Sequence, residues 1–232
     1  MRIQLKVYSM ATPRRMFLLG IPCLAFLAVS VAAIRPVVLA RSLKNDLAQF
    51  GDSRVSEADL RRWALSYDPE AMCDQRGCNV ELSNSLLSAI YLAPPTTLLA
   101  GVSISNGRVV ATGITLVCVN RRNRWPRGAS TTLVIAYEPP SYFRERLTEP
   151  YVGYSPSQNP PSVTYVVTPQ FGARALDVAR EVNVWCLVRL GGCLTGEQQA
   201  PEVWVLPETP PPGYGGKPGT DLWWPKPGVG AR

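Results

Sequence analysis

The longest apolar run of the chain lies near its N-terminus, where residues 16–34 contain no charged side chain and are bounded by Arg15 and Arg35. At a helical rise of about 1.5 Å per residue this run reaches about 28 Å, close to the roughly 30 Å hydrocarbon thickness of a bilayer. It predicts a transmembrane anchor or, alternatively, the apolar region of a cleaved export signal. Small residues at 31–33 and 38–40 are typical of signal peptidase sites, whereas the length of the run favours the anchor.

The residues before this run are basic and predict the orientation of the chain. Residues 1–15 contain four Lys or Arg, and the first acidic residue of the chain is Asp46. Because basic flanks stay on the cytoplasmic side, we expect the N-terminus inside and the rest exported. The segment from Arg14 to Leu18 also resembles the core of a twin-arginine export signal, with Pro13 where that signal normally has Ser or Thr. Export by the Sec route and by the twin-arginine route therefore both stay open.

Helical periodicity dominates residues 35–70, which we interpret as a helical stalk. Apolar residues recur at helical spacing from Pro36 to Phe50, and Gly51 is expected to end that helix. Ser56 and Asp59 form an approximate capping box for a second, short helix that ends at Asp68 and Pro69. The apolar face of this second helix is predicted to contain Leu60, Trp63, Ala64 and Tyr67.

Strand patterns dominate residues 71–207, which predict an extracytoplasmic α+β domain with a mostly antiparallel sheet. The clearest signal is a hairpin over 102–119, because Asn106 and Gly107 suit the two positive-φ positions of a type I′ turn. A short helix is expected after Asn84, ending before Pro94. Further strands are predicted at 131–137, 162–168, 182–190 and 202–206, and a helix at 173–180, with a long surface connection over 139–161.

Residues 208–232 are rich in Pro and Gly and predict a mobile, disordered tail, because they contain too little apolar surface to offset the entropy of ordering. Trp223 and Trp224 are unusual in such a tail. They could dock on the domain, meet a membrane surface, or bind a partner that recognises Pro-rich ligands.

The charge distribution argues against nucleic acid as a partner. The net charge is +7, but residues 1–40 hold five Lys or Arg and no acidic residue, which leaves nineteen basic against seventeen acidic residues in the remainder. The exported part is therefore nearly neutral. One basic segment stands out before a predicted strand; it is either a solvated loop or a surface for anionic head groups, and it contains Arg121, Arg122, Arg124, Trp125 and Arg127.

The chain contains no histidine, so it cannot assemble a Ser-His-Asp or Cys-His nucleophile or a His-ligated metal site. We expect neither a metal nor a cofactor. Five cysteines follow the apolar run, and an oxidising compartment favours disulfides between them: Cys73, Cys78, Cys118, Cys186 and Cys193. We predict a Cys73–Cys78 bridge; Cys193 then pairs with Cys186 or Cys118, unless Cys118 and Cys186 bridge neighbouring strands.

The leading hypothesis is a non-enzymatic, membrane-anchored protein of the cell envelope that binds a protein partner or takes part in an assembly. The order of anchor, helix and sheet over residues 16–140 resembles the general plan of pilin-like subunits of surface fibres and secretion systems. Those subunits usually carry a glutamate early in the apolar run, whereas the first glutamate here is Glu57. The alternative is a secreted hydrolase of envelope polymers that uses carboxylates near the first cysteine loop, namely Asp68, Glu70, Asp74 and Glu81.

Overall fold

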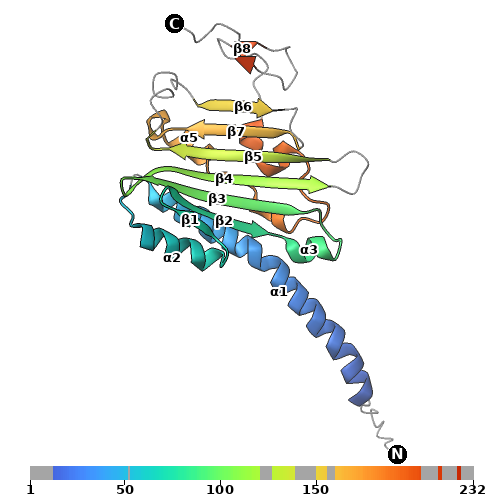
Figure 1. Cartoon of the computed structure of the whole chain (residues 1–232). Coiled ribbons are helices and arrows are strands. Elements are labelled where there is room, and N and C mark those ends of the chain that lie inside the picture. Colours follow the sequence, from blue (N-terminus) through green and yellow to red (C-terminus); the bar gives the residue numbers. More distant parts are fainter. Residues whose placement is uncertain are drawn as a thin grey trace, which may run out of the picture.

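The protein consists of a long N-terminal helix and a seven-stranded sheet that is covered by helices on one face (Figure 1). For residues 13–28 and at a few element ends, the computed structural model describes the backbone alone. The described residues are 13–51, 53–120, 127–138, 150–155 and 160–204, with two short strands at 214–215 and 224–225.

The first helix, α1 (Pro13–Phe50), is continuous through Pro36 and includes the helix predicted from there to Phe50. Proline removes only one backbone hydrogen bond from a helix, and the buried face that begins at Val37 offsets this loss. That face packs on the sheet through Val37, Ala40, Leu43 and Leu47. The N-terminal half of α1 extends away from the sheet (Figure 1). Gly51, with φ of 47°, ends the helix as predicted.

In the part of the chain that the structure describes, no helix is long and apolar enough to cross a membrane. The side chains of residues 16–28, which form most of the predicted span at 16–34, lie outside that part. The described remainder of α1 contains Arg35, Arg41 and Lys44. The predicted membrane span is therefore not confirmed.

Helix α2 (Glu57–Tyr67) has the predicted boundaries and cap. The Ser56 hydroxyl accepts a hydrogen bond from the Asp59 amide at 3.1 Å and donates one to the Asp59 carboxylate at 2.6 Å. Leu60 and Ala64 are buried, as expected from the apolar face of the helix.

The sheet is mostly antiparallel, as predicted, with the strand order β1-β2-β3-β4-β5-β7-β6. Among the described strands, the β5–β7 pair alone is parallel. Strands β1, β2 and β6 were not predicted from the sequence. The strands are β1 (Met72–Asp74), β2 (Gly77–Ser83), β3 (Thr96–Ser105), β4 (Arg108–Asn120), β5 (Arg127–Ala136), β6 (Tyr151–Ser155) and β7 (Ser162–Val167).

The β3–β4 hairpin confirms the strongest local prediction. Asn106 and Gly107 adopt φ values of 51° and 72°, which are the positive values of a type I′ turn. In β4 the side chains of Ile114, Leu116 and Cys118 point into the core, and the intervening residues lie on the opposite face.

Short helices between the strands and after the sheet complete the domain. The helix predicted after Asn84 is α3 (Ser85–Ala89), and that predicted at 173–180 is α5 (Ala173–Val178). The predicted strands at 182–190 and 202–206 are wrong. Their described residues form 3-10 helix η2 (Val184–Leu187) and helix α7 (Pro201–Trp204), next to η1 (Pro169–Phe171) and α6 (Gly196–Gln199).

Local chemistry explains these two corrections. The Asn183 side chain caps η2 by accepting a hydrogen bond from the Trp185 amide at 3.2 Å. Gly191 and Gly192 then turn the chain back with φ values of 84° and 74°. Pro201 opens α7, and proline is favoured at a helix start and disfavoured within a sheet.

In the predicted tail the structure describes only the strand pair β8 (Tyr214–Gly215) and β9 (Trp224–Pro225). The rest of 208–232, including Trp223, lies outside the described residues, and so does the side chain of Trp224. The predictions for the tail therefore stay predictions.

Candidate functional site

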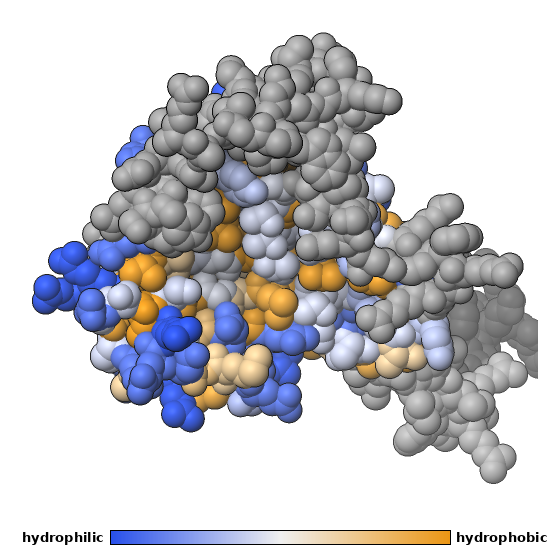
Figure 2. All heavy atoms as spheres, turned by 45° about the horizontal axis from the view of Figure 1, so that its top comes forward, coloured by the Kyte–Doolittle hydropathy of each residue, from blue (hydrophilic) through white to orange (hydrophobic). Residues whose placement is uncertain are grey.

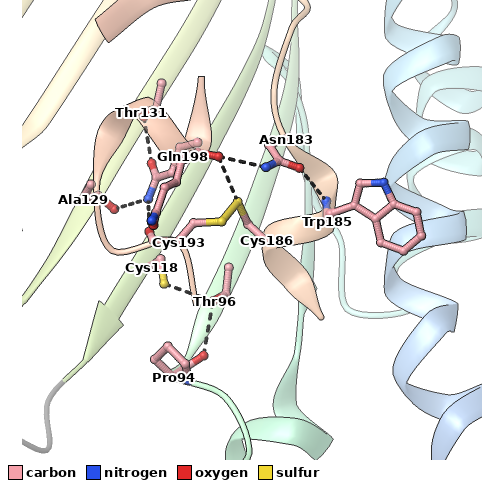
Figure 3. Close-up of a disulfide and its surroundings, with 11 residues drawn as sticks. Pro94, Thr96, Cys118, Ala129, Thr131, Asn183, Trp185, Cys186, Cys193 and Gln198 are labelled. Atoms are coloured by element: carbon pink, nitrogen blue, oxygen red, sulfur yellow. Dashed lines mark hydrogen bonds between the residues drawn. A yellow bond between two sulfur atoms is a disulfide. The ribbon is translucent and has the colours of Figure 1, made fainter. Parts of the chain in front are cut away.

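The described part of the domain contains two disulfides. Cys73 bonds to Cys78, as predicted, and the two are directly paired residues of β1 and β2. Cys186 bonds to Cys193, which is one of the two pairings that the sequence left open for Cys193. The latter bridge joins η2 to the segment after the Gly191–Gly192 turn (Figure 3). Two disulfides indicate an oxidising, extracytoplasmic compartment.

Cys118 is free and fully buried, so the alternative bridges through it are not formed. Its sulfur accepts a hydrogen bond from the Thr96 hydroxyl at 3.3 Å (Figure 3). Gly192 lies directly against this sulfur, and a Cβ at Gly192 would approach it to 2.8 Å. Burial raises the pKa of the Cys118 thiol, which keeps it protonated and a poor nucleophile.

The buried Gln199 side chain makes three hydrogen bonds in the described core. Sequence patterns gave no indication of this role. Its amide nitrogen donates to the carbonyls of Ala129, at 2.8 Å, and Cys193, at 3.0 Å. Its amide oxygen accepts a hydrogen bond from the Thr131 hydroxyl at 2.7 Å. These contacts join α6 to β5 and to the second disulfide.

Two of the four carboxylates of the hydrolase alternative, those of Asp68 and Asp74, accept hydrogen bonds from backbone amides. Asp68 accepts hydrogen bonds from the amides of Glu70, at 2.9 Å, and Glu81, at 3.1 Å. Asp74 accepts from the amides of Arg76 and Gly77 at the β1–β2 turn. Glu70, Asp74 and Glu81 are exposed.

The predicted basic segment lies almost entirely outside the described residues. Of Arg121, Arg122, Arg124, Trp125 and Arg127, only the backbone of Arg127 is described, as the first residue of β5. It pairs with Asn120, the last residue of β4. Whether this segment binds an anionic surface therefore stays a prediction.

Helices α1 and α2 are held together by an acidic and aromatic cluster. The Asp46 carboxylate accepts hydrogen bonds from the Trp63 indole, at 3.2 Å, and the Tyr67 hydroxyl, at 2.7 Å. The Trp63 ring contacts Phe50 edge-on, with ring centroids 5.0 Å apart. Burial, assisted by Asp46, raises the pKa of Tyr67. The polar groups of the cluster are hydrogen-bonded to one another, and all its members are half-buried, which fits a structural role.

A shallow groove of about 320 Å³ lies between α1 and α5. Its charged residues are the basic Lys44 and Arg180 and the acidic Asp177 and Glu181. Such a lining does not select for a ligand of one charge.

The face of the sheet opposite the helices presents hydroxyls and small apolar groups. One row across it consists of the exposed Glu81 followed by Leu99, Thr115, Thr132 and Thr164, in which the Thr115 and Thr132 hydroxyls are hydrogen-bonded at 3.1 Å. Figure 2 shows hydrophobic and weakly polar residues over the middle of the visible surface and strongly hydrophilic ones along one margin. This composition suits contact with another protein surface better than binding of an ion.

Apolar side chains are also exposed where α1 leaves the domain. Helix α3 and the turn that follows it lie beside α1 at this point (Figure 1). Trp185 of η2 projects toward α1 and stacks on the Arg41 guanidinium, whose carbon is 4.6 Å from the ring centroid (Figure 3). We define the exit-end surface as the exposed residues Ile90, Tyr91, Leu92, Trp185 and Leu190.

No known protein family, curated protein or solved structure matches this chain.

Proposed function

We propose that the protein is a non-enzymatic component of the cell envelope, attached to the membrane by the N-terminal half of α1, that acts by binding a protein partner or by assembly. The observation that carries this proposal is a domain with two disulfides built on a helix whose outer half, residues 16–34, has no charged residue.

The disulfides support export. In a reducing cytosol thiol systems keep such bonds open, whereas exported proteins retain them. The Cys73–Cys78 and Cys186–Cys193 bridges lie at separate places in the domain. A reducing cytosol would open both of them.

The layout of α1 supports attachment and assembly. Its C-terminal half is part of the domain core through Val37, Ala40, Leu43 and Leu47, and its N-terminal half extends away from the sheet (Figure 1). An uncharged half-helix outside the core requires an apolar environment of its own, which a bilayer supplies. The pilin-like interpretation of the sequence needs this order of protruding helix and sheet.

The arrangement of polar groups favours binding over catalysis. Asp68 and Asp74, two of the four carboxylates of the hydrolase alternative, accept hydrogen bonds from backbone amides. The centre of the sheet face, with Thr115 and Thr132, offers an uncharged surface for a protein partner, with Glu81 at its margin on β2.

The test is extraction of membranes with alkaline carbonate, which releases peripheral proteins and retains embedded ones. We expect the full chain to stay in the membrane and its domain to be digested by protease added from outside the cytoplasm. The Leu24→Arg variant should be released or fail to insert, because arginine at the centre of a span costs about 2.5–3.5 kcal/mol. The Leu24→Ala variant is the matched control and should stay embedded. Release of the unmodified chain by carbonate would contradict the proposal.

A further inference from the structure

We propose that the exit-end surface rests in the head-group layer of the membrane and holds the domain against an anionic bilayer surface. This inference deepens the proposed function and depends on the membrane attachment of α1. It concerns a different part of the molecule, the domain itself, and assigns a lipid-contacting role to residues on α3, η2 and their following turns.

The apolar run leads directly into the domain, because both belong to the continuous helix α1. The uncharged run ends at Ile34, and the first buried residue of α1 is Val37. Three residues of helix correspond to about 4.5 Å. A bilayer of about 40–45 Å with a hydrocarbon core of about 30 Å has polar layers of about 5–7 Å on each side. A domain that starts this close to the hydrocarbon must contact the head groups.

The exit-end surface consists of aromatic and aliphatic side chains. Tyr91 and Trp185 are 74% and 51% exposed, and aromatic side chains of this kind are enriched at membrane interfaces. Ile90, Leu92 and Leu190 add exposed aliphatic groups. Lipid contact would cover an apolar surface that water now faces.

Basic side chains lie next to the exit-end surface. Exposed arginines flank the exit-end surface at Arg35 and Arg41 of α1 and at Arg189 after η2. Basic residues next to a membrane attract anionic lipids by about 1 kcal/mol each. The Arg41 guanidinium is stacked on the Trp185 ring, so a basic and an aromatic group of this surface lie in direct contact.

The turn after α3, which contains Ile90, Tyr91 and Leu92, is fixed by hydrogen bonds. Tyr91 adopts φ of 62°, which is rare for a bulky residue and strained. The Leu87 carbonyl accepts hydrogen bonds from the amides of Leu92, at 2.9 Å, and Ala93, at 3.2 Å. The Asn84 side chain also donates to the Pro94 carbonyl at 3.0 Å. The exposed residues therefore belong to a fixed turn.

The experiment uses the full chain in vesicles of phosphatidylcholine and phosphatidylglycerol, with and without bromine in the upper acyl chains. Tryptophan is added at the exit end by Tyr91→Trp and, separately, by Leu92→Trp. The control is Ser105→Trp, at the opposite end of β3 and about 30 Å from Thr96 along the strand. The emission of the unmodified chain is subtracted from each, and carbonate extraction of the same vesicles reports attachment.

We expect brominated lipids to remove most of the added emission of both exit-end variants and none of that of Ser105→Trp. An embedded chain whose exit-end tryptophans keep their emission would overturn this inference and leave the proposed function intact. Release of the chain by carbonate would overturn both.

Discussion

Gln199 shows how much a single buried amide contributes to the connection between the C-terminal segment and the sheet. Three hydrogen bonds leave its side chain, and all three partners are buried or belong to the backbone of buried residues. Removal of one member of such a network leaves the other groups desolvated and unpaired, which is costlier than the net worth of the bonds themselves.

We therefore expect Gln199→Leu to lower the free energy of unfolding by about 3 kcal/mol or more, measured by urea denaturation. Its neighbour Gln198 provides the control, because its hydrogen bonds in the described part of the chain use the backbone. The Gln198 carbonyl accepts from the Asn183 side chain at 2.9 Å, and its amide donates to the Thr195 carbonyl at 3.2 Å. Gln198→Leu should change the stability by less than about 1 kcal/mol. Equal losses for the two variants would contradict this role of Gln199.

Cys118 predicts a loss of stability at alkaline pH. Burial raises the pKa of its thiol above the ordinary value of 9.0, so between these two pKa values the folded state binds more protons than the unfolded state. Stability from this group is complete below about pH 9 and falls as pH rises through the folded pKa.

The Cys118→Ala variant removes this titration. We expect its free energy of unfolding to fall less between about pH 8 and about pH 10 than that of the unmodified chain. The slope is compared rather than the absolute value, because the smaller side chain leaves a cavity that lowers stability at every pH. Parallel slopes would show that the thiol is not protected by burial.

At the scale of secondary-structure elements, the α1–α2 contact depends on Asp46. Its carboxylate is the common acceptor for Trp63 and Tyr67, which lie one turn apart on α2. Asp46→Ala should lower the free energy of unfolding by about 1–3 kcal/mol, because the indole and hydroxyl donors lose a charged acceptor. The exposed neighbour Asn45 supplies the control, and Asn45→Ala should be nearly neutral. Near-neutral behaviour of Asp46→Ala would rule out this contact as a stabilising one.

Elements specified by local chemistry were predictable from the sequence. The Asn106–Gly107 turn and the Ser56 cap each depend on residues within a few positions of one another, and both have the expected geometry. The run 182–190 was mispredicted as a strand because its apolar residues satisfy both patterns, and the Cys186–Cys193 bond and the Gly191–Gly192 turn decide in favour of η2.

The candidate site was predictable only in part, for a related reason. The Cys73–Cys78 bridge closes a short loop and could be inferred from spacing. Gln199 could not, because its partners at Ala129 and Thr131 are 70 and 68 residues away. The exit-end surface also depends on tertiary structure, since α3 and η2 meet α1 only in the folded protein.

At the scale of the whole molecule, α1 is both a part of the domain core and the element that leaves the domain. Val37, Ala40, Leu43 and Leu47 are buried in the core, and the apolar run lies on the same unbroken helix. Because no flexible linker separates the two halves, we expect the domain to be held close to the site of attachment.

The central claim is that the apolar run stays joined to an exported, disulfide-bonded domain. It is tested most directly by the intact mass of the chain from membranes, after free thiols are alkylated under denaturing, non-reducing conditions. We predict a full-length chain of 25.4 kDa in which four of the six cysteines are protected as Cys73–Cys78 and Cys186–Cys193. A chain that starts at Ile34 or Arg41, or one in which these four thiols are alkylated, would contradict the claim.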